Sequence, residues 1–291
     1  MMQWNTPVAV GKPDFQIEPF DELLFVGSCF ANGIGQRFRE EQFRATVNPF
    51  GTMYNPASVL HTIERTDVVP RVAFITLGTN HVYILKETGE IVDNCQKRPA
   101  RLFDERELSV TECADYLHRC VEVLRSRRRD VHVVFTVSPI RYAKYGFHGS
   151  QLSKATLLLA VHEVLQAIRN LSQTMPPSFG GGTGEAPASY FPAYEIVLDE
   201  LRDYRFYAPD MLHPSEQAVE YIFQRLADVY FSDAAKRFLD EWRPVKEALH
   251  HRPLHPESAE YLAFKAQVNE KIQRLKEKYP LLEIVDDENP L

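Results

Sequence analysis

Residues that could carry out nucleophilic catalysis stand at two places in the chain. Ser28 and Cys29 follow the run Leu23–Val26, and Asp210 and His213 stand three residues apart late in the chain. A hydroxyl or thiol, an imidazole and a carboxylate are the groups that this chemistry needs, because a base must activate the nucleophile and a carboxylate must orient the base. The sequence therefore offers one candidate set for covalent catalysis.

Cys29 lies between a predicted strand and a predicted helix. The first turn of a helix carries partial positive charge and free N–H groups, which stabilise a thiolate. Ser28 is the alternative nucleophile, and the same histidine can serve either residue. A small buried side chain without chemistry is the competing interpretation of Cys29.

The pair Asp210 and His213 has two interpretations. A tight turn can bring the carboxylate to the imidazole of a histidine three residues later, as an acid–base pair requires. An Asp before a helix is also a common cap, and Pro214 is a typical first helical residue. The spacing alone does not separate these two interpretations.

Further polar groups could hold an oxyanion or an anionic ligand. Gly51, the backbone N–H of Cys29 and the side-chain amide of Asn80 are candidate oxyanion donors, with Gly78 beside them, although glycines here also fit plain turns. Arg141 and Arg205 could recognise a carboxylate or phosphate, or form internal ion pairs with nearby aspartates. Lys154 is either a site cation or a helix-surface residue.

The elements that must position these groups alternate between strand and helix. Strands are predicted at Leu23–Val26, Arg44–Val47, Val72–Leu77 and Val131–Val137, of which Leu23–Val26 and Val72–Leu77 are expected to be buried, and a hairpin is predicted over Val82–Leu85 and Gly89–Val92. Helices are predicted after Cys29 and at Pro56–Glu64, Ser109–Arg127, Leu152–Leu171, Ala193–Leu201, Pro214–Tyr230, Ala234–His250 and Pro256–Lys278. This alternation indicates a parallel sheet, whose ligand site lies beyond the carboxyl ends of the strands.

Composition excludes several classes of protein. The 291 residues include 44% hydrophobic residues and carry a net charge of −7, which suits an α/β domain and argues against nucleic-acid or anionic-membrane binding. Neither a signal segment nor a membrane span is readable, so a cytoplasmic protein is expected. The four cysteines form no CxxC pair, so we expect free thiols and no metal site, with Cys113 and Cys120 on one buried helix face.

The motifs resemble a known family. The order Gly-x-nucleophile, Gly, Gly-x-Asn and Asp-x-x-His resembles the SGNH (GDSL-like) hydrolases, and Gly27–Ala31 (GSCFA) resembles the signature of the GSCFA-domain proteins, a bacterial branch of that group. Other segments that look like that family are Asn48–Gly51, Leu77–Thr79, Asn94-Cys95, Ser138–Arg141, Ser153–Ala155, Tyr190–Glu195 and Leu201–Tyr207. The resemblance implies a flavodoxin-like three-layer α/β/α sandwich with a mostly parallel sheet, here followed by C-terminal helices.

The resemblance also implies roles, with departures. The SGNH nucleophilic serine falls on Cys29 and its preceding aspartate on Ser28, so a thiol replaces a hydroxyl. The stretch between Pro56 and Val72 looks shorter than usual, and Asn80-His81 differs from the expected pair. Family substrates are not established, so the resemblance implies fold and site better than reaction.

The resulting expectations are specific. Residues 1–232 form the α/β domain, and residues 233–291 form a helical extension packed on or beside it. The resemblance implies an SGNH-like hydrolase or acyltransferase that acts on an ester or thioester of a small molecule or glycan, through Cys29 or Ser28 with the pair Asp210 and His213, and we expect no cofactor. The alternative is a non-catalytic module that binds a carbohydrate or acylated ligand, and a weaker one is an interaction protein built on the C-terminal helices. Residues 176–187 are predicted to be a flexible glycine-rich loop.

Overall fold

A five-stranded parallel sheet forms the centre of the protein. The computed structural model describes residues 5–93, 98–174 and 187–284. The strands are β1 (Leu23–Gly27), β2 (Ala45–Val47), β3 (Val72–Leu77), β7 (His132–Val137) and β8 (Ala188–Tyr190), and they pair in the order β2-β1-β3-β7-β8. Counting only these parallel strands, the order is the 2-1-3-4-5 arrangement of flavodoxin-like sheets.

The central strands are buried on both faces because their sequences are continuous apolar runs. Every residue of β1, β3 and β7 is buried, and Phe25 of β1 stacks on its register partner Phe74 of β3 with ring centroids 4.6 Å apart. Buried strands of this kind need helices on both faces. The predicted strand positions are confirmed.

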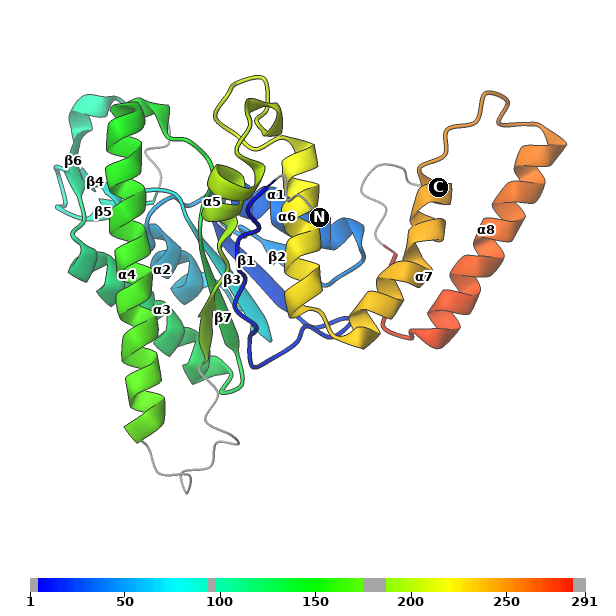
Figure 1. Cartoon of the computed structure of the whole chain (residues 1–291), viewed down its shortest axis with the longest axis horizontal. Coiled ribbons are helices and arrows are strands. Elements are labelled where there is room, and N and C mark those ends of the chain that lie inside the picture. Colours follow the sequence, from blue (N-terminus) through cyan, green and yellow to red (C-terminus); the bar gives the residue numbers. More distant parts are fainter. Residues whose placement is uncertain (1–4, 94–97, 175–186, 285–291) are drawn as a thin grey trace.

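Helices form the two outer layers (Figure 1). α2 (Pro56–Arg65), α3 (Val110–Arg127) and α4 (Gly146–Thr174) bury their apolar faces against one side of the sheet. α1 (Cys29–Glu40) and α6 (Glu216–Tyr230) pack on the other side, with α5 (Ala193–Glu195) and the π-helical segment η3 (Ile196–Leu201) close by. The architecture is the predicted three-layer sandwich.

Local sequence signals explain where several helices begin. Ser109 and Glu112 form a capping box at the start of α3, and Asn55 caps α2 by accepting the Ser58 N–H at 2.9 Å. Cys113 and Cys120 of α3 are fully buried free thiols, as their spacing predicts. Cys95 lies outside the described residues.

A second, smaller sheet follows β3. β4 (His81–Leu85) pairs antiparallel with β5 (Ile91–Val92), which confirms the predicted hairpin, and also with β6 (Phe103–Glu107). β6 is absent from the sequence prediction because its sequence FDERE is mostly charged, and four of its five residues are exposed. Three short helical segments lie in the loops of this domain: η1 (Ala100–Leu102), η2 (Ala143–Tyr145) and η4 (Tyr204–Phe206).

Two long helices follow α6, and the first of them contacts the C-terminal end of α1. α7 (Asp233–Leu249) and α8 (Ala259–Lys278) enclose a separate apolar cluster around Trp242, which is 1% exposed. The Trp242 indole donates to the carbonyl of Glu40 at the end of α1, at 3.1 Å. Figure 1 shows these helices on the side of the molecule opposite α4.

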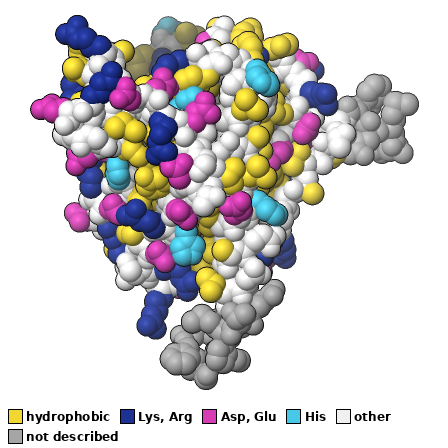
Figure 2. Space-filling model, turned by 90° about the vertical axis from the view of Figure 1, so that its left-hand side faces the viewer, with side chains coloured by type: hydrophobic (Ala, Val, Ile, Leu, Met, Phe, Trp, Pro, Cys, Tyr) yellow, Lys and Arg dark blue, Asp and Glu magenta, His cyan; other side chains and the backbone are white. Residues whose placement is uncertain are grey.

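The surface over α4 carries mixed charge. Figure 2 shows Lys and Arg side chains interspersed with Asp and Glu on this face, without a field of one sign over its described part. None of the described helices is long and apolar enough to span a bilayer.

Candidate active site

Several of the predicted chemical groups lie together at the carboxyl edge of the central sheet. Ser28 and Cys29 follow β1, Gly78 follows β3, and Ser138 follows β7. Together with the loop that carries His213, they surround a pocket of about 230 Å³. Its lining residues are Ser28, Cys29, Tyr54, Gly78, Ser138, Ile140, Arg141, Tyr142, Ala143, Lys144, Lys154, Leu212 and His213.

The turn between β1 and α1 places two nucleophiles at the pocket. Gly27 has φ +141°, and a Cβ there would lie 2.0 Å from the Thr76 carbonyl oxygen, so only glycine permits this turn. Cys29 is the first residue of α1 and is partly exposed. Ser28 stands at the N-cap without capping the helix, is 1% exposed, and its hydroxyl has no hydrogen-bond partner in the described structure.

The hydrogen bond that the structure gives the Cys29 sulfur joins it to Tyr54, not to His213. The Tyr54 hydroxyl lies 3.3 Å from Sγ, and the backbone carbonyl of Tyr54 accepts the N–H groups of Gly78 and Thr79 at 2.8 Å. Burial and the contact with Cys29 raise the pKa of Tyr54, so its hydroxyl stays protonated at neutral pH and can donate to sulfur.

Asp210 and His213 form the acid–base contact that their spacing permits. Asp210 Oδ2 lies 2.5 Å from Nδ1 of His213, while Oδ1 accepts the backbone N–H groups of Leu212 and His213 at 2.9 and 3.0 Å. These backbone bonds, followed by the imidazole, lower the pKa of Asp210 to about 2. Ser215, not Asp210, caps α6. The Asp210 carboxylate instead bonds to the His213 imidazole and to backbone N–H groups of its own turn.

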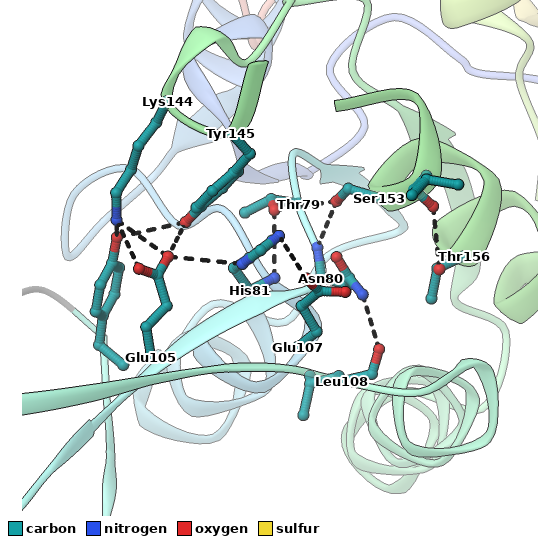
Figure 3. A network of polar contacts seen from close by, with 12 residues as sticks. Thr79, Asn80, His81, Glu105, Glu107, Leu108, Lys144, Tyr145, Ser153 and Thr156 are labelled. Carbon is teal, nitrogen blue, oxygen red and sulfur yellow. Dashed lines mark hydrogen bonds and ion pairs between the residues drawn. The ribbon is translucent and has the colours of Figure 1, made fainter. Parts of the chain in front are cut away.

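Lys144, one of the residues that line the pocket, belongs to a polar network with Glu105 and Tyr145 (Figure 3). Glu105 of β6 accepts from Lys144 Nζ at 3.0 Å and from the Tyr145 hydroxyl, and Tyr145 stacks on His81 at 3.6 Å. Burial alone raises the pKa of Glu105, but the bonds from Tyr145 and Lys144 together hold it below its usual value. The small sheet therefore holds Lys144 in place beside the pocket.

The two candidate arginines occupy different places. Arg141 lines the pocket, donates to the Met211 carbonyl at 3.0 Å and lies over the Phe147 ring at 4.0 Å. Arg205 does not line this pocket and pairs with Asp203 at 3.1 Å. The geometry thus favours the internal ion pair for Arg205.

Two predicted oxyanion donors are not brought to the pocket. The Gly51 N–H donates to the Asn48 carbonyl within its own turn at 2.8 Å, and Gly51 is not a lining residue. The Asn80 side chain is buried and donates to the Leu108 carbonyl at 2.8 Å, which ties β3 to the start of α3. The backbone N–H of Cys29 lies in the first turn of α1, where such groups have no intrahelical partner.

Tyr54 and Lys154 are pocket residues whose roles the sequence leaves unassigned. Lys154 is 2% exposed and donates to the Gly78 carbonyl at 2.7 Å. A signal for Lys154 exists in its spacing, since it precedes the buried Leu157 and Val161 by three and seven residues and so shares their helix face. No comparable signal points to Tyr54.

Two family models match the sequence. The model of the GSCFA family matches residues 22–70 and 68–226, and the model of the GSCFA domain protein C-terminal domain matches residues 242–288. This chain belongs to the GSCFA family. No curated protein matches it.

Several solved structures of esterases are similar to this chain at low identity. An acetyl esterase mutant with acetate ion is 10% identical, with a TM-score of 0.42 over 76% of this chain and 99% of that one. A family two carbohydrate esterase from Clostridium thermocellum in complex with cellohexaose is 13% identical, with a TM-score of 0.42 over 76% and 65%. A carbohydrate esterase family 3 protein from Talaromyces cellulolyticus is 10% identical, with a TM-score of 0.40 over 75% and 99%.

Proposed function

We propose that this GSCFA protein is an acyl-transfer enzyme that cleaves an ester or thioester of a small molecule or glycan in the cytoplasm. One observation carries the proposal: Cys29 and His213 line the same pocket, and the His213 Nδ1 is held 2.5 Å from the Asp210 carboxylate. That bond leaves Nε2 as the imidazole nitrogen available to a nucleophile.

The reaction has two balanced steps. His213 Nε2 takes the Cys29 thiol proton while sulfur adds to the acyl carbonyl carbon. The resulting oxyanion collapses, breaks the bond to the alkoxy or thiolate leaving group, and the leaving group takes the proton from His213. Water or an acceptor hydroxyl then attacks the Cys29 thioester, gives its proton to His213, and releases the acyl product as the thiol is restored.

The pocket offers donors for the oxyanion besides those that the sequence suggests. The backbone N–H of Cys29 belongs to the first turn of α1, whose dipole favours negative charge. The Tyr54 hydroxyl already contacts the sulfur, so it can follow the charge as that charge moves from sulfur to the carbonyl oxygen. Ser28 adds a buried hydroxyl that has no hydrogen-bond partner among the residues that the structure describes.

A substrate panel with matched variants tests the proposal. Short acyl esters and acyl thioesters are offered to the wild type, Cys29→Ala, Ser28→Ala and His213→Gln, each checked for folding by circular dichroism. We expect Cys29→Ala and His213→Gln to lose turnover and Ser28→Ala to keep most of it. Equal turnover by all four proteins refutes the proposal, and loss in Ser28→Ala alone moves the nucleophile to Ser28.

A binding module is the second candidate function, favoured by the partner of Cys29. In this structure the sulfur bonds to Tyr54 rather than to the imidazole, which suits a thiol that packs instead of reacting. Rapid alkylation of Cys29 at neutral pH, well ahead of the buried Cys113 and Cys120, would argue against this alternative.

We further propose that residues 1–232 form the catalytic domain and residues 233–291 form an extension that takes no part in the reaction. The described residues that line the pocket fall between 28 and 213. Trp242→Ala, which loosens the extension, is expected to lower stability without changing KM. A changed KM in a folded Trp242→Ala protein would contradict this division.

A further inference from the structure

Lys154 is a buried cation on the floor of the pocket. It lies on α4 with its side chain 2% exposed, on the same helix face as Leu157 and Val161. Its Nζ donates to the Gly78 carbonyl at 2.7 Å, and the centroid of the Tyr194 ring is 6.0 Å away. An ammonium has three N–H donors, so this carbonyl leaves two of them for a ligand.

The charge of Lys154 has no carboxylate partner within the part of the chain that the structure describes. Two other cations line the pocket, but both are already engaged: Lys144 pairs with Glu105, and Arg141 binds a backbone carbonyl and lies over Phe147. No Asp or Glu is among the described residues that line the pocket. A buried charge without a counter-ion is costly, and such groups gather at ligand sites.

Burial lowers the pKa of Lys154 to about 7. Near neutral pH its nitrogen therefore exchanges between ammonium and amine, and an anion beside it favours the ammonium. Lys154 therefore lacks a counter-ion among the described residues, and it lines the same pocket as Cys29.

We propose that Lys154 makes this pocket a subsite for an anionic oxygen, a carboxylate or a phosphate, carried by the ligand that reaches Cys29. The substrate class becomes an acyl donor with a negatively charged group in the part that enters the pocket. The reaction after binding rests on the proposed function, whereas the anion subsite does not depend on it.

Alkylation of Cys29 tests the subsite without any assumption about catalysis. Iodoacetate and iodoacetamide both alkylate the thiolate, forming an S–C bond as iodide leaves, and they differ in that one carries a carboxylate where the other carries a neutral amide. Their second-order rate constants are measured on the full chain by quantifying the Cys29 peptide, and each is divided by the rate constant for glutathione at the same pH. We expect the normalised rate constant for iodoacetate to be about ten times that for iodoacetamide. A roughly tenfold difference is what one hydrogen bond to a charged group contributes.

Variants assign the preference to one side chain. In Lys154→Met we expect the normalised ratio to fall to about one, because both reagents then alkylate Cys29 with the relative rates that they show toward glutathione. Lys144→Met serves as the matched control on the same pocket, and it should change the ratio less than twofold because Glu105 already neutralises Lys144. A wild-type ratio equal to that of glutathione, or a raised ratio that survives in Lys154→Met, overturns the proposal.

Competition in the wild type gives a second measurement that needs no variant. Succinate and inorganic phosphate are added separately against iodoacetamide, with sodium chloride at equal ionic strength as control. Slower alkylation with succinate identifies a carboxylate ligand, slower alkylation with phosphate identifies a phosphate ligand, and protection by neither anion overturns the subsite.

The two proposals fail in different ways. Anion-dependent alkylation together with inactivity on every acyl donor removes the acyl-transfer function and leaves the subsite. Turnover of acetyl and succinyl thioesters with equal kcat/KM removes the subsite and leaves the function. If Lys154→Met lowers kcat for both donors equally and leaves both KM values unchanged, Lys154 acts on the developing oxyanion and the proposed substrate anion is wrong.

Discussion

Replacing Lys154 with Met should make the protein more stable at neutral pH. The perturbation removes a buried charge and keeps a side chain of similar length at a position that is 2% exposed. Burial lowers the pKa of Lys154 from 10.5 to about 7. At about 1.4 kcal/mol per pH unit this difference corresponds to roughly 5 kcal/mol. Losing the hydrogen bond to the Gly78 carbonyl offsets about 1 kcal/mol, so we expect a gain of a few kcal/mol.

The gain must depend on pH with a defined sign. Below pH 7 the ammonium is present in both the folded and the unfolded wild type, so the full cost of burying it lowers the stability. Between about 7 and 10.5 the folded chain has released the proton while the unfolded chain still holds it, so wild-type stability rises with pH. Above that range both states are neutral, and the advantage of Lys154→Met disappears.

Urea unfolding of both proteins at about pH 6, 8 and 10 measures this difference, and groups that do not interact with Lys154 cancel from it. The Cys29 thiol lines the same pocket, so the series is repeated in the Cys29→Ala background. A stability difference that stays constant across the three pH values would refute the reasoning, because it would mean that Lys154 carries the same charge in both states.

The remaining predictions concern Asp210, which orients the base His213, the turn between β1 and α1, and the C-terminal extension. Asp210→Asn should lower kcat by about two to four orders of magnitude with little change in stability, because an amide cannot stabilise the imidazolium of His213; unchanged kcat in the acyl panel would contradict this role. Gly27→Ala should fail to fold or unfold far more readily in urea, since its Cβ would meet the Thr76 carbonyl oxygen at 2.0 Å. Trp242→Ala should cost roughly 3–5 kcal/mol in urea unfolding, and a cost below about 1 kcal/mol would show that the extension is not held through this side chain.

The fold could be predicted because its strands are continuous apolar runs that end at Gly27, Gly78 and Ser138. Such runs have one stable environment, the interior of a parallel sheet between two helical layers. β6 could not be predicted, since the Asp, Glu and Arg side chains of Phe103–Glu107 face solvent and only pairing with β4 makes this segment a strand.

The candidate site was predictable where function is local and not where it depends on distant partners. Asp210 and His213 lie in one tight turn, so their spacing already constrains the contact. Asn80 has the residue type of an oxyanion donor, but the Leu108 carbonyl, 28 residues away in sequence, engages its amide nitrogen. A lysine is usually exposed, so its residue type predicts a surface position for Lys154. Only its place on the same helix face as the buried Leu157 and Val161 indicates that it is buried.

The order of the strands along the chain also determines when each pocket residue is synthesised. The residue carrying the thiol follows the first strand, whereas the imidazole at residue 213 follows the last strand of the central sheet. A nascent chain on the ribosome therefore exposes sulfur long before it has a proton acceptor for that sulfur. Chains that terminate early carry a thiol without a base, so under the proposed mechanism incomplete products are inert toward acyl donors.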